Sequence, residues 1–161
     1  MKTVKERLVL WAVLAFGCGS PTDECRDKGD ITYPKAHPER VSIQQGIWGL
    51  VAYWEGDFMP VCVSGTVRAA GREMRVHAAT SCREEIGPFY KEVSTPEVAR
   101  VWSDADGFFQ VSLPPGEYSL FSLEDSLLYA NGCDSRHIRP VTVHPDSVVK
   151  VTFDITWDAT S

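Results

Sequence analysis

The sequence lacks any apolar run long enough to cross a bilayer as a helix, and it has little positive charge. The uninterrupted apolar run Leu8–Phe16 contains only nine residues, against the roughly 20 that a membrane-spanning helix needs. Lys and Arg number 16 against 22 Asp and Glu, which gives the 161-residue chain a formal net charge of −6. No basic stripe is present that would neutralise phosphates. These absences argue against nucleic acid as a partner and against adhesion to anionic lipid through charge.

The front of the chain has the pattern of an export signal. Lys2, Lys5 and Arg7 precede the apolar run, and the small residue Gly17 ends it. A basic start, a short apolar run and small residues at its end are typical of a secretory signal peptide. The alternative is a buried core helix, but such a helix has one polar face, and this run is apolar on every side. We therefore predict a signal peptide over residues 1–17.

Cys18 follows that signal directly. A cysteine after glycine at the end of an apolar run resembles the lipobox of bacterial lipoproteins. The resemblance implies that Cys18 is acylated and becomes the first mature residue. The match departs from the usual pattern, since Ala15 and Phe16 stand where the family prefers leucine and a small residue, and Leu14 lies one place early. Ordinary cleavage and an uncleaved anchor stay open. We expect an exported lipoprotein of the bacterial envelope, at the outer membrane or on the periplasmic face, attached to the membrane through this lipid.

Residues 18–40 are polar and contain three prolines, without helical or strand periodicity. We predict a tether there and a single domain over residues 41–161. In that domain the apolar residues alternate with polar ones, which favours strands with one buried face. The clearest example is 148–157, where Val149, Val151, Phe153 and Ile155 share one side. We expect these four to be buried together with Trp48, Val111 and Leu120.

The sequence predicts seven strands with turns at short intervals, and this pattern indicates an all-β antiparallel sandwich. They cover residues 43–54, 73–80, 98–102, 108–113, 117–123, 141–143 and 148–157. A hairpin is expected between the third and the fourth, because Gly107 ends the turn that joins them. The segments 55–72, 83–96 and 124–139 are expected to be long loops.

Four motifs stand in order along this domain: G-I-W-G at 46–49, G-D-F-M-P at 56–60, D-A-D-G-F at 104–108 and L-P-P-G-E-Y-S-L at 113–120. Together they resemble the carboxypeptidase regulatory-like domains, and the resemblance covers about residues 43–157. It implies a transthyretin-like (prealbumin-like) sandwich. Asp104 and Asp106 also invite a calcium interpretation, but an EF-hand loop beginning at Asp104 would need Glu at its twelfth position, where Pro115 stands.

Zinc peptidase chemistry has no matching residues in this sequence, although the domain family that the sequence resembles is named after the carboxypeptidases. It requires a His-x-x-Glu pair, and the residues three places after His37, His77, His137 and His144 are Arg40, Thr80, Pro140 and Ser147. The adjacent acids at 84–85 and 124–125 would face opposite sides of a strand, so we expect them to be solvated. We predict no metal, no cofactor and no catalytic residue. The expected function is a structural or binding module that presents loops to a protein or glycan. The alternative is an enzyme that draws its residues from the three long loops.

Four further cysteines predict two disulfides, since an even number in an exported chain usually pairs. They are Cys25, Cys62, Cys82 and Cys133. In an antiparallel sandwich successive loops lie at alternating ends, and only cysteines at one end approach within the roughly 4.4–6.8 Å that a disulfide requires between Cα atoms. Following the seven strands in order places Cys62 and Cys133 at one end of the sandwich and Cys25 and Cys82 at the other. We therefore predict the disulfides Cys62–Cys133 and Cys25–Cys82.

Overall fold

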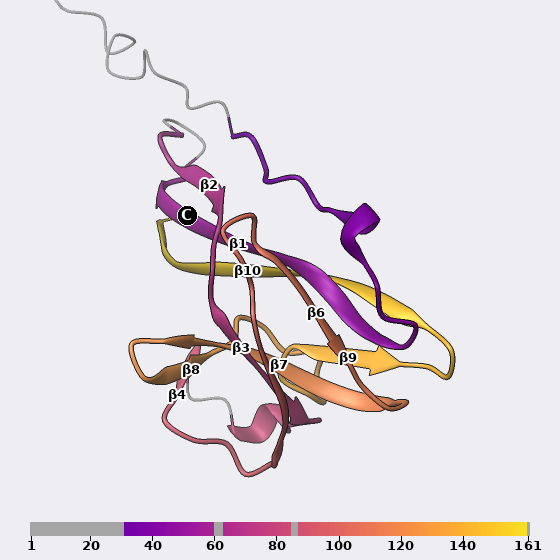
Figure 1. Ribbon diagram of the computed structural model, residues 1–161. Helices are drawn as coiled ribbons and strands as arrows, with labels where there is room; N and C mark the ends of the chain where they lie inside the picture. Colours follow the sequence, from indigo (N-terminus) through magenta and orange to yellow (C-terminus); the bar gives the residue numbers. More distant parts are fainter. Residues whose placement is uncertain (1–30, 60–62, 85–86, 161) are drawn as a thin grey trace, which may run out of the picture.

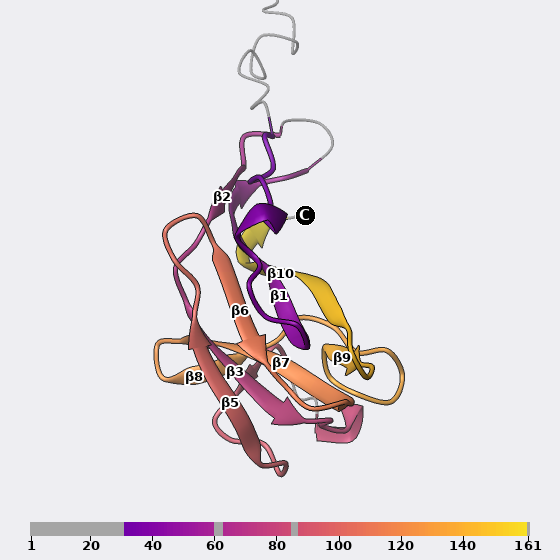
Figure 2. The same cartoon turned by 45° about the vertical axis from the view of Figure 1, so that its right-hand side comes forward.

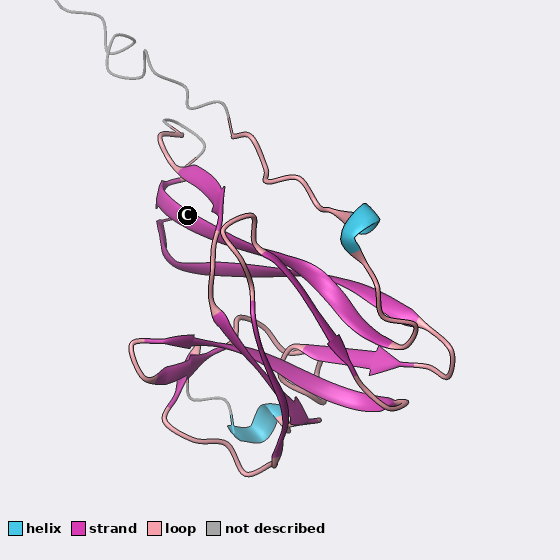
Figure 3. Ribbon diagram, viewed as in Figure 1, coloured by secondary structure: helices cyan, strands magenta, loops and turns pink. Residues whose placement is uncertain are grey.

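The alternating segments form the two sheets of a β-sandwich, as the computed structural model shows for residues 31–59, 63–84 and 87–160 (Figure 1). Sheet A contains four strands: β1 (Gly46–Asp57), β2 (Thr66–Ala69), β6 (Phe108–Ser112) and β10 (Val148–Thr160). Sheet B contains six: β3 (Glu73–Ala78), β4 (Phe89–Tyr90), β5 (Glu97–Trp102), β7 (Gly116–Glu124), β8 (Leu127–Tyr129) and β9 (Pro140–Val143). The helical residues of this part of the chain form two short 3₁₀ turns, Pro38–Arg40 and Cys82–Glu84 (Figure 3). The prediction of an all-β sandwich is confirmed.

Two parts of the fold prediction were wrong: the number of strands and the purely antiparallel pairing. The described residues form ten strands, and the three that the sequence did not indicate, β2, β4 and β8, lie inside the segments predicted as long loops. They have only two to four residues each, which is too short for a periodic pattern. The long strands β1 and β10 pair in parallel, with Gly46 opposite Val148 and Val51 opposite Phe153. The ends of both strands therefore lie together.

The predicted hairpin of residues 98–113 is also wrong. β5 pairs with β3 in sheet B, whereas β6 pairs with β1 in sheet A, so the turn between them crosses from one sheet to the other (Figure 2). Asp104 organises this turn, because its Oδ1 accepts hydrogen bonds from the backbone N–H of Asp106 and of Phe108 at 2.9 and 3.1 Å. Gly107 adopts a φ of 74° there, and a Cβ atom would lie 2.4 Å from the carbonyl oxygen of Val51.

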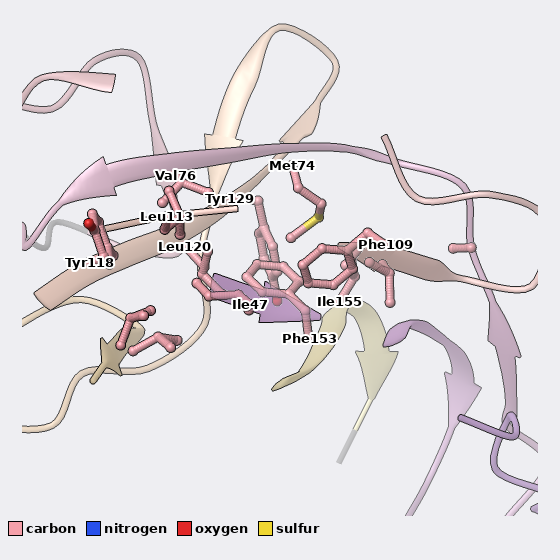
Figure 4. Packing of buried hydrophobic residues seen from close by; sticks show 14 of the residues in the cluster. Ile47, Met74, Val76, Phe109, Leu113, Tyr118, Leu120, Tyr129, Phe153 and Ile155 are labelled. Atoms are coloured by element: carbon pink, nitrogen blue, oxygen red, sulfur yellow. The ribbon is translucent and has the colours of Figure 1, made fainter. Parts of the chain in front are cut away.

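The main core lies between the two sheets (Figure 4). Leu120, Phe153 and Ile155 are fully buried in it, as predicted, and Val111, Val149 and Val151 pack at its margin, partly exposed. Trp48 was assigned to the wrong face. It is buried on the outer side of sheet A, against Phe108 with ring centroids 6.3 Å apart and with the Lys150 ammonium 5.7 Å from its ring.

The outer face of sheet A is buried because the N-terminal strap, residues 31–45, runs along it (Figures 1 and 2). The domain therefore begins before residue 41, and the part of the predicted tether from Ile31 to Arg40 lies against the sheet. Arg40 forms ion pairs with Asp104 and Asp106, and its guanidinium lies 4.3 Å from the ring centroid of Phe108. Two residues further, the backbone N–H of Ser42 donates to the side chain of Gln110.

Side chains cover the free edge of β10, which pairs only with β1 among the described strands. Arg139 Nη2 donates to the carbonyl oxygen of Thr152 at 2.6 Å, and the N–H of Thr156 donates to the hydroxyl of Tyr129 at 3.0 Å. An uncovered strand edge of this length is a site for pairing with other chains. These contacts from sheet B therefore protect the sandwich from edge-to-edge association.

Candidate functional site

The two ends of the sandwich differ in character. At the Trp157 end, defined as the end where β1, β7 and β10 finish, aromatic side chains from both sheets meet. Trp157 of β10 lies beside Tyr53 of β1 and Phe89 of β4, with ring centroids 5.8 and 6.2 Å away. Tyr129 of β8 completes the group, 5.2 Å from Phe89. Trp157 and Phe89 remain 43 % and 38 % exposed, so this aromatic cluster reaches the surface.

Paired charges surround the cluster. Arg68 and Arg72 place their guanidinium groups 4.9 and 5.3 Å from the ring centroid of Tyr53. Arg72 Nε lies 3.0 and 3.2 Å from the two carboxylate oxygens of Glu124, while Arg68 pairs with Glu55. Glu124 is buried and also accepts a hydrogen bond from Ser122. The expectation that it is solvated was therefore wrong: it holds the start of β3 against the end of β7.

Tyr53 is held in its neutral form. Burial raises the pKa of its hydroxyl to about 12, helped by the hydrogen bond that it donates to Asp158 at 3.1 Å and by the negative charge of that carboxylate. A phenol that stays protonated and donates to a fixed carboxylate is a structural contact at neutral pH. It anchors the aromatic cluster to the last residues of β10.

At the opposite Pro114 end, where β1 and β10 begin, the turns are polar and tied to one another. Gln45 Nε2 donates to the carbonyl oxygen of Leu113, and its Oε1 accepts from the backbone N–H of Asp146. Tyr118 donates to the carbonyl oxygen of Pro114 at 2.8 Å. A shallow groove of about 470 Å³ lies among these turns, lined by Gln44, Gln45, Ser112, Leu113, Pro114 and Pro115.

A disulfide joins two loops on the outer side of sheet B, toward the Pro114 end. Cys82 and Cys133 are bonded, with Cα atoms 5.9 Å apart and a sequence separation of 51. Backbone hydrogen bonds reinforce the junction, from Cys82 N–H to the Arg136 carbonyl and from Ile138 N–H to the Thr80 carbonyl. Beneath these loops lies a second small core around Phe121, Leu128 and Ile138. The junction thus fixes the loops as an ordered surface.

This disulfide contradicts the predicted pairing of Cys62 with Cys133 and of Cys25 with Cys82. The physical reason is β8, a three-residue strand that the pattern did not reveal. Both β3 and β8 pair antiparallel with β7, so they run in the same direction and end on the same side. Cys82 and Cys133 each stand four residues after the end of those strands. Cys18, Cys25 and Cys62 lie outside the described residues.

The histidine and aspartate residues that the sequence analysis considered as metal ligands make structural contacts where the structure describes them. His77 is buried in β3, with its Nδ1 2.9 Å from the carbonyl oxygen of Thr95. Asp104 pairs with Arg40 and binds backbone N–H groups of its own turn. Among residues 31–59, 63–84 and 87–160, no group of three or more His, Cys, Asp or Glu side chains is placed to hold a metal ion. Over the same ranges, no helix is long and apolar enough to span a membrane.

The three segments offered as an enzyme's source meet at the Trp157 end. Arg72 of 55–72 pairs with Glu124 of 124–139, and Phe89 of 83–96 packs against Tyr129 of 124–139. The aromatic cluster could not be predicted from the sequence, because its members come from four strands, two of them too short to show a periodic pattern. Comparison with family models, with curated proteins and with solved structures finds no match.

Proposed function

We propose that this protein is a non-catalytic lipoprotein of the bacterial envelope, anchored through Cys18, whose sandwich presents ordered loops to a protein or glycan partner. The Cys82–Cys133 disulfide carries the proposal. Disulfides persist in oxidising compartments outside the cytosol, which supports export. The bond also ties two surface loops to each other, and loops held by a rigid scaffold are where binding residues concentrate.

The finer fold assignment is part of the same proposal. A transthyretin-like sandwich of the carboxypeptidase regulatory-like kind is supported by the D-A-D-G-F and L-P-P-G-E-Y motifs, since each forms a tight connection between the two sheets. Asp104 binds the backbone within the first connection, and Tyr118 binds the Pro114 carbonyl in the second. Both motifs thus have structural roles, which fits an accessory domain.

Fractionation of cells that express the full chain tests the anchor. Wild-type protein should partition with the membrane fraction and incorporate labelled palmitate, and Cys18→Ser should be released and unlabelled. If Cys18→Ser keeps both the label and the membrane association, the lipid is not on Cys18.

Capture from the native envelope tests the binding role. The double variant Cys82→Ser/Cys133→Ser frees the two loops and leaves the anchor in place. A partner that recognises these loops should be retained by the wild type and lost with the variant. Identical capture by both proteins would count against presentation of these loops.

A further inference from the structure

The exposed apolar side chains gather at one end of the molecule. Eight large apolar side chains are more than a third exposed among the described residues, and seven lie at or toward the Trp157 end: Ile31, Tyr33, Met59, Phe89, Trp102, Leu127 and Trp157. The strands place three of them there. Trp102 pairs with Glu73 at the start of β3, Leu127 pairs with Glu124 at the end of β7, and Met59 follows the end of β1.

The eighth side chain, Val98, lies toward the other end. It follows Glu97, which pairs with His77 near the end of β3, and His77 pairs in turn with Ser119 near the start of β7. Val98 is 47 % exposed. The Pro114 end itself consists of polar turns joined by Gln45. The molecule is thus asymmetric along its strands, and scattered apolar exposure, which is normal on a protein surface, does not produce such an arrangement.

The N-terminal strap begins at this same apolar end. Tyr33 packs edge-on against Trp54, with ring centroids 6.1 Å apart, and Trp54 lies 5.0 Å from Phe58. An apolar groove of about 270 Å³ lies beside them, lined by Trp54, Phe58, Thr156 and Ala159. Residues 18–30 separate Cys18 from the strap. Even fully extended, that span reaches at most about 45 Å, which is close to the length of the 13-residue strand β10.

We propose that the Trp157 end rests on the lipid surface in which Cys18 is anchored, an inference that depends on the proposed lipid anchor. Aromatic side chains favour the boundary between water and lipid, where one part of the ring is apolar and another is hydrated. The two arginines beside the aromatic cluster are already paired within the protein, Arg72 with Glu124 and Arg68 with Glu55. Contact with lipid therefore comes from the rings and not from a basic patch.

This orientation assigns a role to each end. With the Trp157 end on the membrane, the Pro114 turn and the disulfide-joined loops point away from it. They are then the surface that a partner in the envelope meets. One end of the sandwich thus contacts the membrane, and the other end presents loops to a partner.

Site-specific photo-crosslinking in the full-length chain tests the orientation. The photoreactive residue p-benzoylphenylalanine is incorporated in place of Phe89 in one variant and in place of Val98 in another. Both positions are similarly exposed, so they form a matched pair at the two ends. Membranes from cells grown with labelled phosphate are irradiated, and the purified chain is assayed for covalently attached phospholipid. Non-reduced peptide mapping of Cys82–Cys133 verifies that each variant has folded.

We expect the variant at position 89 to carry at least fivefold more phospholipid than the variant at position 98. Equal labelling, absence of lipid at position 89, or an adduct of a discrete protein there would overturn the orientation while the anchor stands, provided that the chain sediments with membranes. If the wild type is absent from the membrane fraction, the proposed anchor itself fails, and the orientation fails with it. The two failures are therefore distinguishable.

Discussion

Tyr33 donates a hydrogen bond to Asp154 across 121 positions of sequence, with Tyr33 Oη 2.5 Å from Asp154 Oδ1. The same oxygen accepts from Trp54 Nε1 at 2.9 Å. Burial, this hydrogen bond and the carboxylate charge all raise the pKa of Tyr33 above its ordinary value. One carboxylate in the last strand thus holds both the strap and the first strand, at the point where the chain from Cys18 joins the domain.

Replacing Asp154 with Ala should free the start of the strap. Hydrogen bonds to a charged acceptor contribute about 1.5–3 kcal/mol, so local release should increase by about tenfold or more. Trypsin cleavage after the exposed Lys35 measures this rate. Asp154→Asn is the matched control, because its amide oxygen still accepts from Tyr33 and Trp54, and it should be cleaved nearly as slowly as wild type. Equal rates for Asp154→Ala and wild type would show that this contact does not hold the strap.

Asp104 should make the domain sensitive to acid. Burial disfavours its charged form, but the hydrogen bonds from Arg40 and from the N–H groups of Phe108 and Asp106 outweigh burial, with the Arg40 charge adding to them, so the pKa of Asp104 is lowered. A lowered pKa contributes stability above the unfolded value of about 3.9, and this is lost as pH falls through the folded value.

Urea unfolding at pH 6 and at pH 3 checks that expectation. The free energy of unfolding should fall further between these two pH values in wild type than in Asp104→Asn, because the variant has no carboxylate to protonate there. Other carboxylates contribute equally to both proteins, so the difference isolates Asp104. An identical fall in both would contradict the assignment.

The disulfide should stabilise the domain by restricting the unfolded chain. For the sequence separation of 51 residues, the chain-entropy relation gives about 4 kcal/mol. Cys82→Ser/Cys133→Ser should therefore unfold at much lower urea than wild type under non-reducing conditions. Peptide mapping of unreduced wild type should yield a linked Cys82–Cys133 peptide, and a Cys62–Cys133 peptide would restore the pairing inferred from sequence.

Phe153 is a large side chain of the core between the two sheets. It is fully buried and lies 6.5 Å from the ring of Tyr129 in the opposite sheet. Phe153→Ala should reduce the free energy of unfolding by about 3–5 kcal/mol. Val98→Ala, which removes an exposed apolar side chain, should change it by less than about 0.5 kcal/mol. Similar losses for both variants would mean that the core lies elsewhere.

Long alternating strands made the fold class predictable. The pattern of 148–157 placed Phe153 and Ile155 on the buried side, because burial of one face acts on every second residue. The same reasoning misplaced Trp48, since the strap covers the outer face of sheet A and both sides of β1 are buried. Local alternation contains no information about what a distant segment covers.

Short strands explain the wrong cysteine pairing and the missed aromatic cluster. Leu127–Tyr129 is too brief for a period, yet its presence reverses the chain and decides which cysteine meets Cys82. The aromatic cluster depends on the same strand and on the two-residue strand Phe89–Tyr90. Its members, including Tyr53 and Trp157, are brought together by the packing of two sheets, which a single sequence does not display.

The intact mass of the protein extracted from the envelope tests the central claim most directly. If Cys18 is the lipidated first residue, the mass should equal residues 18–161 with acyl groups added, and fragmentation should place the added mass on Cys18. A chain that retains residues 1–17, or one cleaved there without any added lipid, would contradict the anchored module described here.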